Sequence, residues 1–229
     1  MTHARDEMES LYPFLYADTS DLPSVLEQVR ASTEAKAAEI GELRQVIARR
    51  DAERIAACAR DMAERFAAGG RLFAFGNGGS ATDAQQLATL FMHPGAAPAD
   101  GELPALPAFG LANDTSVVTA LCNDIGVDVV FARQLAAFGG PGDIAVGLST
   151  SGNSANLLRA FDEARRLGML TVGLAGYEGG KMAELAGHEG ASIDYLFVAP
   201  SASVHRIQEA QTTIYQVLWE LTARLAAQL

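Results

Sequence analysis

Residues Leu148-Ser-Thr-Ser-Gly-Asn-Ser154 place four hydroxyl side chains and a glycine directly behind a short apolar run. An amphipathic helical pattern follows from Ser154 to Leu167, and Gly168 ends it. Such a turn offers hydroxyl donors, backbone N–H groups and a helix N-terminus to one anion. The stretch therefore predicts a strand, a phosphate-binding loop and a helix in direct succession. The candidate phosphate ligands are Ser149, Thr150, Ser151 and Ser154.

A second glycine-rich turn, Gly76-Asn-Gly-Gly-Ser80, also separates an apolar run from a helical pattern. Ser80, with Asp83 three positions on, fits a helix capping box, so a plain strand-to-helix turn is an alternative interpretation. The glycines lack the spacing of the dinucleotide fingerprint. The loop Ser149–Ser154, called the serine loop below, lacks the Gly-Lys-Ser/Thr of a nucleotide P-loop. A dinucleotide site is therefore only a distant alternative.

Short apolar runs alternate with helical patterns through most of the chain. The predicted strands are Arg71–Phe75, Ala108–Ala112, Ile144–Ser149, Leu170–Ala175 and Tyr195–Val198. The predicted helices between and after them are Ser80–Phe91, Ser116–Cys122, Val127–Phe138, Ser154–Leu167, Lys181–Ala186 and Ser203–Ala226. This alternation predicts an α/β fold, a three-layer αβα sandwich around a five-stranded parallel sheet.

Right-handed crossovers bring the carboxyl ends of all strands to one edge of such a sheet. With the strand order 2-1-3-4-5, the sheet reverses direction between its first and third strands, and ligands bind at that switch point. The first strand ends in Gly76–Ser80 and the third in Ser149–Ser154. We therefore expect the two turns to be neighbours.

The N-terminal part carries no strand pattern. Residues 1–20 have no clear period and are predicted to form an arm, and residues 21–229 to form a single domain. Two N-terminal helices are predicted before the first strand, Leu22–Ile47 and Asp51–Ala68, with Asp51 as the N-cap of the second. Amphipathic helices that precede the sheet suggest packing against a partner subunit.

Composition narrows the class of protein. Hydrophobic residues make up 49% of the 229 residues, enough for a sizeable core. The net charge of −11 argues against nucleic acid as a partner, because phosphate backbones require clustered Lys and Arg. Cys58 and Cys122 have no metal-ligand spacing and are expected to be core residues. With no apolar stretch long enough to span a membrane and no signal-peptide pattern, a cytoplasmic location is expected.

Several segments together resemble one family, the sugar isomerase (SIS) domain family, over residues 20–226. The resemblance is greatest to its phosphoheptose isomerase branch, which acts on sedoheptulose 7-phosphate. The segments that carry it, in matching order and spacing, are Gly76-Asn-Gly-Gly-Ser80, Asn113-Asp114, Asn123-Asp124, Leu148–Ser154, Gly179-Gly-Lys-Met-Ala183 and Arg206-Ile-Gln-Glu209.

The resemblance implies a homotetramer (or a homodimer) whose sites lie at subunit interfaces, and a sugar phosphate as the ligand. By position, Ser149, Thr150, Ser151 and Ser154 would hold the phosphate. Asn77, Ser80 and Asp114 would contact the sugar, and Gln208 matches a family glutamine that touches substrate or metal.

Three positions depart from the family pattern. The family isomerises through an enediol, with a glutamate and a histidine moving the proton; Leu90 and Gln216 stand at those positions. Gln86 replaces a further histidine, a metal ligand in some members. Leucine and glutamine have no useful pKa for proton transfer. No metal is assigned, and zinc is not expected with Gln86, Leu90 and Gln216 at the family ligand positions.

Two hypotheses follow. The chain is either a ketose–aldose isomerase with relocated acid and base groups, or a catalytically inactive sugar-phosphate sensor or protein-binding scaffold. His93, on the helix face of Gln86 and Leu90, and His205, beside Arg206, are the candidates for a relocated catalytic role. Each also has a plainer interpretation as a surface histidine.

Overall fold

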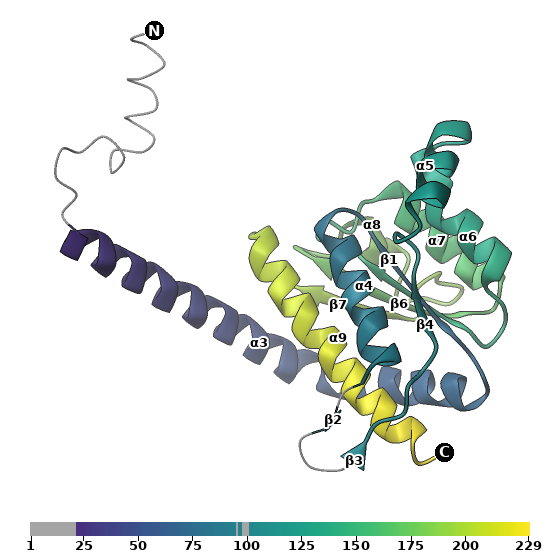
Figure 1. Cartoon of the computed structure of the whole chain (residues 1–229), viewed down its shortest axis with the longest axis horizontal. Helices are drawn as coiled ribbons and strands as arrows, with labels where there is room; N and C mark the ends of the chain where they lie inside the picture. Colours follow the sequence, from purple (N-terminus) through teal and green to yellow (C-terminus); the bar gives the residue numbers. More distant parts are fainter. Residues whose placement is uncertain (1–21, 95, 98–100) are drawn as a thin grey trace, which may run out of the picture. The chain divides into compact units, whose positions relative to one another are not determined.

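The computed structural model describes residues 22–94, 96–97 and 101–229, so the predicted arm at 1–20 lies outside the described residues. The chain divides into two units, one ending at Gly41 and one covering Glu42–Leu229. Figure 1 gives the labels of the helices and strands. The candidate site lies entirely within the second unit.

A five-stranded parallel sheet forms the centre of the second unit, in the order β4-β1-β5-β6-β7. In chain order this is 2-1-3-4-5, as the sequence predicted. β1, β5 and β6 are buried along their whole length, as expected of central strands covered on both faces. The strands are β1 (Leu72–Gly76), β4 (Ala108–Gly110), β5 (Ile144–Leu148), β6 (Leu170–Gly176) and β7 (Tyr195–Ala199).

Helices cover both faces of this sheet (Figure 1). On one face Phe75 packs against Phe131 of α6 and Phe161 of α7, with ring centroids 5.5 and 5.4 Å away. On the other, Phe66 of α3 stacks on Phe91 of α4 at 5.4 Å, and α9 contacts α4. The helices are α3 (Leu22–Ala67), α4 (Gly79–Met92), α5 (Thr115–Asp124), α6 (Val130–Phe138), α7 (Ala155–Arg166), α8 (Gly180–Glu184) and α9 (Val204–Ala226).

Three short elements, η1, β2 and β3, lie outside the central sheet. A 3-10 turn, η1 (Val127–Val129), leads into α6. The segment predicted as a loop after α4 contains a short antiparallel pair, β2 (Ala96–Ala97) and β3 (Gly101–Glu102). None of the helices in the described ranges is long and apolar enough to cross a membrane.

The prediction of two N-terminal helices was wrong, because α3 runs without a break from Leu22 to Ala67. No glycine or proline occurs between Glu42 and Ala67 to end it. Ile47 and Ile55 are both buried, and Asp51 lies between them on the same face, at four-residue spacing and 1% exposed. Asp51 is therefore a buried position inside a helix and not an N-cap.

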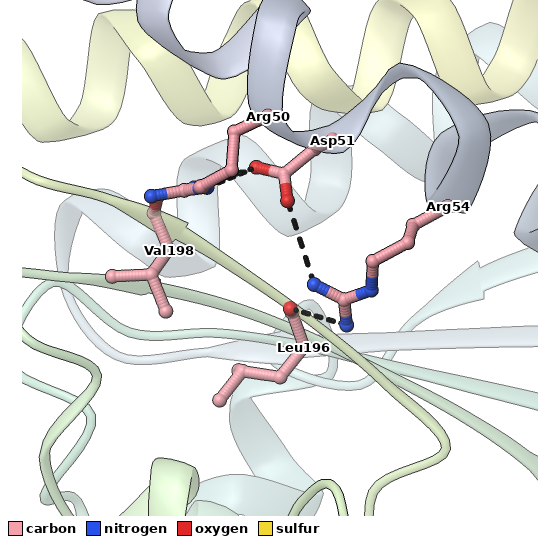
Figure 2. A network of polar contacts seen from close by, with 5 residues as sticks. All are labelled: Arg50, Asp51, Arg54, Leu196 and Val198. Atoms are coloured by element: carbon pink, nitrogen blue, oxygen red, sulfur yellow. Dashed lines mark hydrogen bonds and ion pairs between the residues drawn. The ribbon is translucent and has the colours of Figure 1, made fainter.

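Two arginines hold the buried Asp51 carboxylate (Figure 2). Arg50 donates to it at 2.5 Å, and the Arg54 guanidinium lies 3.4 Å away. The same guanidinium groups donate to backbone carbonyls of the edge strand β7, Arg50 to Val198 and Arg54 to Leu196. An exposed strand edge is a template for pairing with another chain. The network therefore occupies hydrogen-bonding positions on that edge while fixing α3 against it.

Replacing Asp51 with asparagine is expected to lower the free energy of unfolding by about 1.5–3 kcal/mol, the range for hydrogen bonds to charged groups. The amide is nearly isosteric but pairs poorly with two guanidinium groups. Urea denaturation measures the change. The exposed Glu53, two positions on, provides the control: Glu53→Gln should stay within about 0.5 kcal/mol of the parent protein. Equal effects of the two substitutions would contradict a stabilising role for the network.

Candidate functional site

The two glycine- and serine-rich turns are neighbours, as predicted. Gly76 at the end of β1 pairs with Leu148 at the end of β5. The side chains of Asn77 and Asn156 exchange two amide hydrogen bonds of 2.9 Å each, which join the turn after β1 to the first turn of α7. Asn156 is buried, and sequence reasoning missed it because a single asparagine in a helix carries no signal of a partner so far along the chain.

The serine loop folds around its own hydroxyl groups. The backbone N–H of Gly152 donates to Ser149 Oγ at 3.0 Å, and that of Asn153 to Ser151 Oγ at 3.2 Å. Ser154 is the N-cap residue of α7, but its side chain makes no capping hydrogen bond. First-turn N–H groups have no partner within their own helix. The loop therefore presents hydroxyls and the positive end of the α7 dipole at the same place.

The loop is locked against the turn that begins α8. Gly152 has a φ of +66°, and a Cβ there would lie 2.0 Å from the Gly179 carbonyl oxygen. The backbone N–H of Met182 donates to the Gly152 carbonyl, and that of Lys181 to Asn153 Oδ1, each at 3.0 Å. Only glycine fits at position 152, so the shape of the loop depends on this contact.

Gln211 of α9 contacts the serine loop from the protein interior. It is fully buried, and its Nε2 donates to the Ser149 carbonyl at 3.2 Å. Its Oε1 has no hydrogen-bond partner among the described residues. Gln211 could not be singled out from the sequence, because one glutamine within a helical pattern carries no signal that its side chain is buried.

Ser80 is not the N-cap of its helix, which corrects the capping-box interpretation. α4 begins at Gly79 with Gly78 at the N-cap position, and no side chain caps it. Ser80 lies buried inside the first turn. The reason is the tight turn at Gly78, whose φ is +55° and which starts the helix before the serine.

Two other predicted sugar contacts, Asp114 and Gln208, also form hydrogen bonds within the chain. Asp114 is the N-cap of α5 and accepts a 3.1 Å hydrogen bond from the Val117 N–H. Gln208 Nε2 donates to Asp83 Oδ2 at 3.2 Å. Partial burial raises the pKa of the Asp83 carboxyl, and the hydrogen bond from Gln208 opposes that rise. Asp83 is thus the carboxyl group that lies beside the family glutamine position.

His93 and His205 do not come together within one chain. Gln208 bonds to Asp83, so the start of α9, including His205, lies by the start of α4. His93 follows the other end of α4, ten residues beyond Asp83, which is about 15 Å along a helix. Both histidines are exposed. A shared catalytic role would require a second copy of the chain.

The outer face of α4 carries a cavity of about 300 Å³ with mostly neutral walls, among them Gln86, Leu90 and His93. Zinc in proteins is bound by thiolate, imidazole and carboxylate groups. Gln86, Leu90 and the exposed Gln216 offer none of these, so they do not fit a zinc ion. Over the described ranges, no three His, Cys, Asp or Glu residues gather closely enough to hold a metal.

Comparisons with known proteins identify relatives of this chain in sequence and in fold. The SIS domain family model matches residues 37–176. The phosphoheptose isomerase of Pelodictyon phaeoclathratiforme is 46% identical over 184 residues, 80% of this chain and 83% of that protein. The solved phosphoheptose isomerase of Neisseria gonorrhoeae has a TM-score of 0.74 at 33% identity and covers 84% of this chain and 97% of its own. That of Francisella tularensis also has a TM-score of 0.74, at 28% identity, with coverages of 87% and 98%.

Proposed function

Because the chain belongs to the SIS domain family, we propose that it binds a phosphorylated sugar whose phosphate group lies on the serine loop. The observation that supports this most is the loop itself, which is held rigidly at the carboxyl end of β5 beside the turn after β1. Ser149, Thr150, Ser151 and Ser154 supply hydroxyl donors, and α7 supplies its N-terminus. An anion is stabilised there without a basic side chain on the loop.

We propose further that the sugar is bound without the family's proton transfer. Abstraction of a proton next to a carbonyl needs a base of suitable pKa within hydrogen-bond reach. Leu90 and Gln216 stand where the family resemblance implies the glutamate and the histidine. His93 follows the last residue of α4, whereas His205 belongs to α9 and lies by the start of α4, so the two do not replace them as a pair. The chain then acts as a sugar-phosphate sensor or scaffold.

Assembly into a homotetramer and a cytoplasmic location are proposed from the family resemblance. One observation supports assembly: Leu22, Leu26 and Val29 form an exposed apolar stripe at helical spacing on the first half of α3, each more than half exposed. Light scattering of the full chain, whose monomer mass is 24.1 kDa, tests the oligomer. A monomer at micromolar concentration would contradict it.

Binding is tested with sedoheptulose 7-phosphate and its unphosphorylated parent sugar. We expect the sugar phosphate to raise the melting temperature in a concentration-dependent way, by the mass action of a ligand that binds only the folded state. The unphosphorylated sugar at the same concentration should have little effect, because the serine loop contacts the phosphate. Equal stabilisation by both sugars would contradict the role given to the loop.

A further inference from the structure

A polar cavity of about 680 Å³, called the amino-end cavity below, opens at the end of the sheet opposite the serine loop. It lies at the first residues of β6 and β7, whereas the serine loop follows the last residue of β5. The last turns of α3 and α7 and residues 187–191 form the rest of its wall. Its volume is typical of small-molecule sites, about 300–1,000 Å³. The ionisable side chains that line it include Asp61, Arg65, Arg165, His188, Glu189 and Asp194.

Two of the carboxylates in the amino-end cavity already have partners. Asp61 Oδ2 accepts a 2.6 Å hydrogen bond from the Tyr195 hydroxyl. Burial and this hydrogen bond raise the pKa of Tyr195, so the phenol keeps its proton and remains the donor. Asp194 Oδ2 accepts from the backbone N–H and from the hydroxyl of Thr171, each at 2.9 Å. These two carboxylates are therefore less available to the arginines of the cavity.

Arg65 is the unpaired positive charge of the amino-end cavity. Its side chain is half-buried, and in the described part of the chain it forms no hydrogen bond or ion pair. This is unexpected in a protein with 28 acidic and 17 basic residues. Asp61 lies one helical turn before Arg65, at a spacing that favours pairing, but is bonded to Tyr195 instead. Withdrawing a guanidinium from water without a partner costs free energy, so Arg65 is a donor that lacks its acceptor.

Two more positive groups surround the same space. Arg165 lies 3.5 Å from Asp194 Oδ1, at the long limit of a hydrogen bond, and its side chain is 48% exposed. The ring nitrogens of His188 lie 3.1 and 3.0 Å from the carbonyl oxygens of Glu189 and Glu184. Both hydrogen bonds form only in the protonated ring, and they raise the pKa of His188. The cavity thus combines two guanidinium groups with an imidazolium.

We propose that the amino-end cavity is a second ligand site, which binds the oxyanion group of a small phosphorylated or carboxylated molecule through Arg65 and Arg165. A planar guanidinium donates two parallel hydrogen bonds to such a group, so arginine suits phosphate and carboxylate recognition. The exposed Glu189 on the rim can accept from a hydroxyl or amino group of the same molecule. This inference goes beyond the proposed function and does not rest on it, because the two sites lie at opposite ends of the strands.

Calorimetric titration with inorganic phosphate tests the site in the variant Ser151→Ala with Ser154→Ala, whose serine loop is disabled. We expect this variant to keep one phosphate site, with a Kd of about 1 mM or lower. Arg65→Gln and Arg165→Gln, each added to that background, should weaken binding at least about tenfold, because each removes a charged donor. Citrate in place of phosphate distinguishes a carboxylate ligand from a phosphate, and binding of either anion that depends on Arg65 supports the site.

Arg60 provides the matched control for the arginine variants. It is exposed on α3 and does not line the cavity, so Arg60→Gln should leave the affinity for the anion unchanged. If the serine variant binds neither phosphate nor citrate, or if Arg60→Gln and Arg65→Gln have equal effects, the proposal is wrong. A failure of the serine loop to bind sugar phosphate would not alter this result, since the loop is disabled in the test.

Asp61→Asn tests the sign of the charge that the ligand carries. The asparagine side chain still accepts a hydrogen bond from Tyr195 but removes one negative charge from the cavity wall. Phosphate should therefore bind about threefold more tightly, the effect of a unit charge a few ångströms away in a water-like medium. The gain should vanish in 1 M sodium chloride, which screens such interactions. Weaker binding of phosphate by Asp61→Asn at low salt would overturn the assignment of an oxyanion ligand.

Discussion

Replacing Gly152 with alanine is expected to destabilise the protein by about 3 kcal/mol or more and to weaken sugar-phosphate binding about a hundredfold. The new Cβ would lie 2.0 Å from the Gly179 carbonyl oxygen, so one of the two turns must move. The left-handed backbone of residue 152 adds about 1–2 kcal/mol for an L-residue, and overpacking adds a similar amount. A displaced loop loses hydrogen bonds to the charged phosphate, each worth about 1.5–3 kcal/mol, and a hundredfold loss of affinity corresponds to about 2.7 kcal/mol.

Gly187 is the matched control for this substitution. Its φ is +79°, close to that of Gly152, but nothing lies within 4 Å of a Cβ built there. Gly187→Ala should therefore cost only the backbone term, about 1–2 kcal/mol, and leave binding intact. Denaturation and calorimetry on both variants separate backbone strain from the steric overlap. If the two variants behave alike, the contact between the serine loop and Gly179 does not shape the site.

Removing two hydroxyls from the loop, in the double variant Ser151→Ala with Ser154→Ala, should weaken sugar-phosphate binding by about 10²–10⁴-fold. Each lost hydrogen bond to a charged group is worth about 1.5–3 kcal/mol. The stability cost should be small, because the Ser154 side chain makes no capping bond to α7, and the 3.2 Å bond that Ser151 Oγ accepts from the Asn153 N–H is exposed. The loss of affinity is then separable from any loss of folded protein.

The control for the serine pair removes two hydroxyls elsewhere in the same unit. Ser116 is exposed in α5, and Ser192 donates to Asp162 at 2.7 Å, neither of them on the serine loop. Ser116→Ala with Ser192→Ala should bind sedoheptulose 7-phosphate as the parent protein does. If the affinity of the double loop variant for sedoheptulose 7-phosphate lies within threefold of that of this control, the serine loop is not part of the site.

The central sheet and its helices were predictable because their signal is local. Apolar runs, glycine stops and N-cap residues gave α7, α9 and the five strands of the central sheet to within one or two residues. The strand order 2-1-3-4-5, from which the switch point was predicted, is the order of this sheet. Because that order makes β1 and β5 adjacent, it also predicted that the two turns that follow them are neighbours. The prediction of two N-terminal helices failed for a physical reason. Aspartate is a common N-cap residue, and only the folded structure shows that the Asp51 carboxylate is buried and paired with two arginines.

The details that shape the site depend on contacts between distant parts of the chain. The pairing of Asn77 with Asn156, the bond from Gln211 to the Ser149 carbonyl and the fit of Gly152 under Gly179 have no local pattern. The serine loop was thus visible in the sequence, and the residues that hold it in place were not.

The most direct test of the account is NMR of sedoheptulose 7-phosphate incubated with the pure parent protein in deuterated water. We expect the ligand to bind, to take up no deuterium at the carbon beside its carbonyl, and to form no aldose product above the protein-free rate. Deuterium incorporation and isomerisation by the parent protein, both abolished by Ser151→Ala with Ser154→Ala, would contradict it and establish an isomerase with relocated proton-transfer groups.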